Sequence, residues 1–150
     1  MLLAWLSAQK RVGEKMVLEA FQNYPLKAQT KLMELYHLIH EVAKKTDGVG
    51  KLDESLKWGE FTFSTNESKS GSPIRIDWKH KDPEKFYIYF NCQTKLISIF
   101  REIYPDDFVY TGNRAISLEL KKRIPKKKLS KCIEMALTYN LRKYNRFFHT

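Results

Sequence analysis

The fold is decided by two segments in the middle of the chain, IRIDWK at residues 74–79 and KFYIYF at residues 85–90. In both segments apolar residues alternate with charged residues or tyrosines. Successive side chains of a β-strand point to opposite faces, so this alternation predicts two strands that share one apolar, buried face. The other face would present Arg75, Tyr87 and Tyr89 to solvent.

Three further segments carry strand signals. Phe61 and Phe63 alternate with polar residues just after Trp58-Gly59, whereas residues 48–54 lack such alternation and are expected to form a loop. Gly112-Asn113 suits a tight hairpin because both residues tolerate a positive φ. We therefore expect an antiparallel sheet of about five strands, at residues 61–64, 74–79, 86–90, 108–111 and 114–121.

The remaining apolar stretches show helical spacing, and several of them end at proline or glycine. In the longest stretch the apolar side chains form one stripe and the charged residues lie opposite. The sequence predicts helices at residues 14–24, 26–46 and 94–103, and from Pro125 to Phe147. This order indicates an α+β fold, with the N- and C-terminal helices packed on one face of the sheet.

The chain has 150 residues, of which 43% are hydrophobic, enough to bury one core. We expect a single domain over residues 14–146, preceded by an extension at residues 1–13. The apolar segment Met1–Leu6 is too short for a membrane span and lacks the basic lead of a signal peptide. We expect it to dock on the domain, to stay disordered, to pair with a second copy, or to precede a start at Met16.

The two cysteines, Cys92 and Cys132, are far apart in sequence and belong to no C-x-x-C pair. This usage indicates reduced thiols rather than a disulfide framework. We therefore expect a cytoplasmic protein.

Four short segments resemble the YdhG-like domain of unknown function family 1801, in order and spacing. They are Leu56-Lys57-Trp58-Gly59, Tyr89–Thr94 with Phe100-Arg101, Gly112–Ile116 and Ile124-Pro125. The resemblance covers about residues 14–144. It implies a small α+β fold similar to frataxin, and for one branch of the family a role as an iron chaperone. No cofactor is predicted from the residues themselves, so iron rests on this resemblance alone.

The candidate metal ligands of the first long helix are Glu34, His37 and Glu41. Their spacings of three and four residues place them on adjacent helical turns, with His40 close by. Helical geometry also puts them opposite the apolar stripe, where they would face solvent among several lysines. Exposed polar residues without a metal are therefore the main interpretation, and iron binding is the alternative.

Basic residues dominate the charge: 27 lysines and arginines against 17 acidic residues give a net charge of +10. A cluster of them precedes and opens the last helix, where the helix dipole disfavours positive charge. The cluster comprises Lys121, Lys122, Arg123, Lys126, Lys127, Lys128 and Lys131. We expect either a solvated surface or a site for nucleic acid or another polyanion.

A candidate ligand surface lies on the outward face of the predicted strands. Aromatic and basic side chains together can stack on a flat ligand, although cross-strand packing explains the same pattern. Trp58 and Trp78 would wall a groove beside it, unless they belong to the core. The candidate residues are Trp58, Arg75, Trp78, Tyr87, Tyr89 and Arg114.

No nucleophile, metal-ligand cluster or phosphate loop has the spacing that its chemistry needs. Cys92 and His80 are the one thiol and imidazole pair close in sequence, and Cys92 is expected to be a buried, inert thiol. The sequence therefore favours a non-enzymatic intracellular binding domain with an unknown small ligand. Polyanion binding is the second hypothesis, and iron binding or delivery is the third.

Overall fold

The computed structural model describes residues 12–142. The interpretations of Met1–Leu6, and of the last helix beyond Arg142, lie outside these residues. Between residues 12 and 142 no helix is long and apolar enough to cross a membrane.

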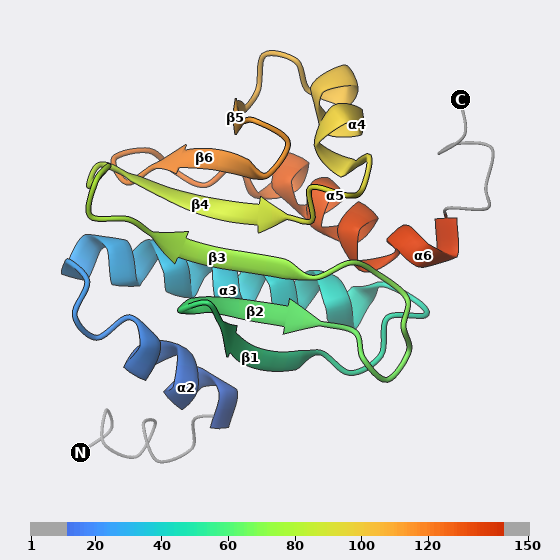
Figure 1. Ribbon diagram of the computed structural model, residues 1–150, viewed down its shortest axis with the longest axis horizontal. Coiled ribbons are helices and arrows are strands. Elements are labelled where there is room, and N and C mark those ends of the chain that lie inside the picture. Colours follow the sequence, from blue (N-terminus) through green and yellow to red (C-terminus); the bar gives the residue numbers. More distant parts are fainter. Residues whose placement is uncertain (1–11, 143–150) are drawn as a thin grey trace.

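The described chain folds into one six-stranded sheet in which every pair of neighbouring strands is antiparallel (Figure 1). The strand order is β1-β2-β3-β4-β6-β5. The strands are β1 (Asp53–Lys57), β2 (Glu60–Ser64), β3 (Ile74–Trp78), β4 (Lys85–Phe90), β5 (Val109–Thr111) and β6 (Ala115–Glu119). The short strand β5 pairs with β6 across the predicted Gly112-Asn113 turn.

The helices are α2 (Val12–Ala20), α3 (Leu26–Lys45), α4 (Leu96–Ile103), α5 (Lys126–Leu137) and α6 (Tyr139–Arg142). In Figure 1 the sheet lies in front of α3 and α5, which pack against each other on its far side. We call the face toward these helices the inner face and the opposite face the outer face. The predicted α+β architecture is thus confirmed, with six strands in place of about five.

The register of the two central strands matches the alternation seen in the sequence. Ile76 pairs with Ile88, and Arg75 pairs with Tyr89. The inner face closes completely against α3 and α5 because its side chains are large and apolar. The largest fully buried side chains are Phe21, Tyr36, Phe61, Phe63, Phe86, Phe100, Leu32, Leu35, Ile39, Ile74, Ile76 and Ile88.

Strand β1 corrects the prediction of a loop at residues 48–54. Its sequence, DESLK, has no alternating apolar residues, so the strand signal is absent. The strand forms because Trp58 and Gly59, with φ of 56° and 78°, make a two-residue turn that folds β1 back on β2. A positive φ at a tryptophan is costly, which is why the turn was not evident from the sequence.

The last helix is interrupted, where the sequence predicted one continuous helix from Pro125. Helix α5 ends at Leu137, and the hydroxyl of Thr138 donates to the carbonyl of Glu134 at 2.7 Å. The β2–β3 loop occupies the end of the helix: the Ser70 hydroxyl donates to the Leu137 carbonyl at 2.7 Å. The Ser70 bond satisfies a carbonyl that a continuing helix would have used, whereas the Glu134 carbonyl also accepts the regular helical bond from the Thr138 backbone nitrogen.

Candidate functional site

The outer face of the central strands carries no helix in the described part of the chain (Figure 1). It is nevertheless mostly closed, because Asp77 and Tyr87 are only 3% and 8% exposed. Arg75 and Tyr89 are partly exposed. The predicted outward direction of these side chains is therefore right, but not all of them reach solvent.

Ion pairs among its own side chains hold this face together. Lys79 Nζ lies 3.0 Å from Glu60 Oε2 and 3.0 Å from Asp77 Oδ2. Glu60 also lies 3.7 Å from a guanidinium nitrogen of Arg75, and the hydroxyl of Tyr24 donates to Asp77 at 2.5 Å. Burial lowers the pKa of Lys79, but hydrogen bonds to Asp77 and Glu60 outweigh it and leave that pKa above its ordinary value. Lys79 therefore remains a cation at neutral pH and fixes both carboxylates.

Two tyrosines of β4 lie side by side next to this network. The rings of Tyr87 and Tyr89 are 5.7 Å apart, and Lys79 Nζ lies 6.0 Å from the centre of the Tyr89 ring. Burial raises the pKa of the Tyr89 phenol to about 12. The Tyr87 hydroxyl donates to Asp82 at 3.0 Å. Both hydroxyls therefore stay protonated at neutral pH and can donate hydrogen bonds.

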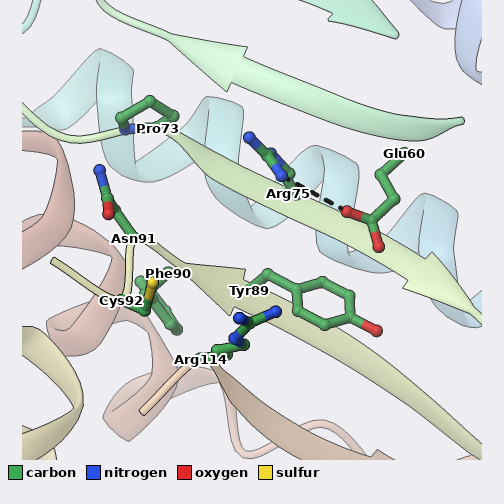
Figure 2. Close-up of a pocket in the computed structure, with 8 residues that line it drawn as sticks. All are labelled: Glu60, Pro73, Arg75, Tyr89, Phe90, Asn91, Cys92 and Arg114. Carbon is green, nitrogen blue, oxygen red and sulfur yellow. Dashed lines mark ion pairs between the residues drawn. The ribbon is translucent and has the colours of Figure 1, made fainter. Parts of the chain in front are cut away.

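A pocket of about 290 Å³ opens at the other end of the same face. In Figure 2 the Arg114 side chain lies beside Tyr89, and Arg75 points toward Glu60. The strand register explains why Arg75, Tyr89 and Arg114 lie close together. Tyr89 pairs with Arg75 on one side and with Ala115, next to Arg114, on the other. The lining residues are Glu60, Pro73, Arg75, Tyr89, Phe90, Asn91, Cys92 and Arg114.

The structure thus brings together three of the six predicted ligand-surface residues: Arg75, Tyr89 and Arg114. Tyr87 lies beside them without lining the pocket. Sequence reasoning missed the other five lining residues, Glu60, Pro73, Phe90, Asn91 and Cys92. Glu60 could have been found, since it alternates with Phe61 and so points outward, but its position beside Arg75 depends on how β2 pairs with β3.

The predicted groove between Trp58 and Trp78 is wrong. Trp78 is 3% exposed, its indole nitrogen donates to the Pro83 carbonyl at 2.9 Å, and its ring packs on Tyr24. Trp58 is 89% exposed at the β1–β2 turn. Trp78 belongs to the inner face by alternation, so the two rings cannot form the walls of one groove.

Cys92 and His80, which are close in sequence, do not meet in the structure, and the prediction that Cys92 is buried is wrong. His80 follows the end of β3, and Cys92 follows the end of β4. Since the two strands are antiparallel, these residues lie at opposite ends of the pair. Cys92 is exposed rather than buried, whereas burial raises the pKa of the Cys132 thiol to about 12 and leaves it inert.

The basic cluster before and within α5 is divided by its partners. Lys121, Lys122 and Lys128 are paired with Glu84, Glu119 and Asp107, respectively. Four members of the cluster are exposed and form no ion pair with any of residues 12–142: Arg123, Lys126, Lys127 and Lys131.

Helix α3 adds a cation to this surface that the sequence did not reveal. The ammonium of Lys31 donates to the carbonyl of Lys122 at 2.8 Å, and Lys31 lines a hollow with Glu34, Arg123 and Lys126. We refer to Lys31, Arg123, Lys126, Lys127 and Lys131 as the basic helix surface.

The three candidate metal ligands of α3 are not gathered around one point. Glu34 lines the hollow with Lys31, whereas His37 and Glu41 line another with Glu14 and His40. Glu41 is also paired with Lys45 at 2.8 Å, and this hydrogen bond holds the pKa of Glu41 below its usual range. Within residues 12–142 no three His, Cys, Asp or Glu side chains form a group that could hold a metal ion. The metal hypothesis stays a prediction.

His40 has a structural partner that was not anticipated. Its Nε2 lies 2.5 Å from Oε1 of Glu54, which also accepts a hydrogen bond from the Tyr36 hydroxyl at 2.8 Å. Glu54 comes from β1, so this cluster ties the edge strand to α3. The contact explains why a polar strand such as β1 is held against the core.

Comparisons with known proteins bear on the fold. No family model matches the sequence, and no curated protein matches it. A crystal structure of YdhG, a protein of the DUF1801 family from Bacillus subtilis, is similar over 85% of this chain and 94% of that chain. The TM-score is 0.55 and the sequence identity is 16%. At this identity the similarity establishes a shared fold.

Proposed function

We propose that this protein is a non-enzymatic binding domain that holds a small molecule in the pocket on the outer face. The observation that carries the proposal is the convergence of Arg75, Tyr89, Asn91 and Arg114 on one hollow, on the face that α3 and α5 leave open. Convergent polar groups around a partly apolar hollow are typical of small-molecule sites.

Some of the side chains that line the pocket are already held in place by their neighbours, so a ligand can bind without ordering them first. Arg75 is steadied by Glu60, and Glu60 is in turn held by Lys79 at 3.0 Å. Side chains that are already ordered lose little conformational entropy when a ligand arrives. The backbone nitrogen of Phe90 donates to the carbonyl of Arg114 at 2.7 Å and fixes the pocket floor.

The lining favours binding rather than catalysis. None of the eight lining residues is a histidine, and the one carboxylate among them, Glu60, is paired with two cations. Cys92 therefore has no general base beside it within the lining set.

A thermal-shift screen of small molecules tests the proposal. A ligand that binds the folded state raises the unfolding temperature, and the shift should shrink strongly in a Tyr89→Ala variant. Lys127→Ala, on the basic helix surface, is the matched control and should respond as the wild type does. Shifts of equal size in Tyr89→Ala would place the ligand elsewhere, and a screen without any shift would count against the proposal.

A second function, polyanion binding, is favoured by the arrangement of the basic helix surface. Lys31 from α3 joins four α5-region cations that lack ion pairs with the described residues, so two helices supply one positive surface. Cations that form no ion pair with a carboxylate of residues 12–142 can neutralise phosphates and release counterions.

The test compares two triple variants with the same change in net charge. Arg123, Lys126 and Lys127 are changed to Glu in one, and the exposed residues Lys57, Lys81 and Lys95 in the other. If the surface binds nucleic acid, the first variant should lose affinity for a DNA or RNA duplex and lower the slope of log affinity against log salt by about 2–3, while the second should change little. Equal losses in both would reduce the effect to net charge.

We also infer that the chain is a divergent relative of the DUF1801 family. The inference is supported by two independent lines: the short segments around Trp58-Gly59 and Gly112-Asn113, and the fold shared with YdhG. Both segments form the tight turns of hairpins, β1–β2 and β5–β6.

A further inference from the structure

The charges around the outer-face pocket are unequal at its two ends. At one end the two carboxylates Glu60 and Asp77 are matched by the two cations Arg75 and Lys79, so this end is close to neutral. At the other end Arg114 is exposed and forms no ion pair with any of residues 12–142. The pocket therefore offers one uncompensated guanidinium, and the group best suited to meet it is an anion.

The side chains that line the pocket between these two ends are suited to contact an apolar part of a ligand. Tyr89 presents its ring to the pocket, and Pro73 and Cys92 add apolar surface (Figure 2). The volume of about 290 Å³ is at the lower end of the range for small-molecule sites. A ligand of this size is a single ring or a short chain, not a dinucleotide or a peptide.

A second polar side chain, that of Asn91, lines the same pocket as the Arg114 guanidinium. Its side-chain oxygen is taken by the backbone nitrogen of Gln93 at 2.9 Å. The amide nitrogen of Asn91 therefore remains the group to face a ligand, and it can only donate. The guanidinium fork of Arg114 matches the two oxygens of a carboxylate or phosphate, and Asn91 supplies a further donor from the lining of the same pocket.

We propose that the pocket recognises small oxyanions, each a carboxylate or phosphate carried on an apolar or aromatic body, with Arg114 as the residue that determines the charge specificity. This inference rests on the proposed function of the same pocket. It adds the chemical class of the ligand and the residue that selects it.

The test uses three probes with the same ring: benzoate, phenyl phosphate and the neutral benzamide. Each is titrated into the full chain, and backbone amide signals are followed by NMR. We expect benzoate or phenyl phosphate to shift the signals of Tyr89, Asn91, Cys92 and Arg114 in a saturable way, with benzamide at least about ten-fold weaker. The better of the two anions identifies which oxyanion the pocket prefers.

Variants separate the role of Arg114 from that of net charge. Arg114→Gln should weaken binding of the anion about ten-fold and leave benzamide unchanged, because a charged hydrogen bond is lost. Arg123→Gln removes an exposed arginine of the basic helix surface and should have no effect. Unchanged amide spectra of the variants show that each remains folded.

The outcomes distinguish the two proposals. Benzamide binding as tightly as the anions, with Arg114→Gln unchanged, would overturn the oxyanion class and leave small-molecule binding in place. Loss of anion binding in Arg123→Gln alone would move the anion to the basic helix surface and overturn the inference. No response to any of the three rings in the pocket would overturn the inference and count against the proposed function as well.

Discussion

The inner and outer faces of one sheet are closed in two different ways. On the inner face, Phe61 and Phe63 are fully buried against the helices by apolar contact. On the outer face, Asp77 is almost as deeply buried, yet its neighbours are Lys79 and Tyr24 rather than a helix. A side chain can thus be buried by the ion pairs of its own surface. Such a surface stays polar, and a binding pocket can form next to the ion pairs, where side chains such as Arg114 have no ion-pair partner among residues 12–142.

The largest expected effect lies on the inner face. Phe63→Ala should lower the free energy of unfolding by about 3–5 kcal/mol, because it removes a fully buried ring and leaves a cavity. The ring packs against those of Tyr36, His40 and Phe61. Urea denaturation followed by circular dichroism measures the change. A loss below about 1 kcal/mol would mean that the inner face is not the main source of stability.

The next effect breaks the polar closure of the outer face. Asp77→Ala should cost about 1–3 kcal/mol in the same denaturation experiment, because Tyr24 and Lys79 both lose a partner. Asp53→Ala is a control on the same face at the sheet edge, where the carboxylate is more exposed and its pairing with Lys51 spans 3.8 Å. It should change stability by less than about 0.5 kcal/mol. Equal effects of the two variants would refute the idea that Asp77 organises this face.

Alkaline pH should weaken the outer face progressively. Burial raises the pKa of Tyr89 to about 12, whereas an unfolded tyrosine titrates near 10. The folded state therefore favours the neutral phenol, and this contribution to stability is complete below pH 10 and is lost as the pH rises toward 12. Denaturation midpoints measured across this range should fall. The fall should be shallower in Tyr89→Phe, which cannot ionise at this position, and an identical slope would exclude Tyr89 as a contributor.

The smallest expected effect on stability belongs to the pocket itself. Arg114→Gln should change the free energy of unfolding by less than about 0.5 kcal/mol, because this exposed side chain has no ion pair among the described residues to lose. A denaturation curve measured beside that of Phe63→Ala checks this. A large loss would show that Arg114 supports the fold, and the residue could then no longer be assigned to ligand selection alone.

Sequence reasoning succeeded where one residue and its neighbours in the chain carry the signal. Ile74, Ile76, Phe86 and Ile88 were predicted to share the inner face, and all four are fully buried. It failed at β1, because the sequence around Glu54 has no alternating apolar pattern, whereas in the structure this strand pairs with β2 and Glu54 contacts Tyr36 and His40 of α3. It also failed for the groove: nothing in the sequence placed Trp58 in an exposed turn, and Trp78 was assigned to the ligand surface although its alternation with Ile74 and Ile76 indicates the inner face.

The sequence by itself determined the α+β class, the alternation of β3 and β4, and the outward direction of Arg75 and Tyr89, because these depend on local periodicity. Only the tertiary structure decided that Arg114 would meet Tyr89 and that Lys31 would join the cations of α5. The physical reason is that strand order and helix packing are set by long-range burial. They bring together residues whose separation in the chain carries no information about their separation in space.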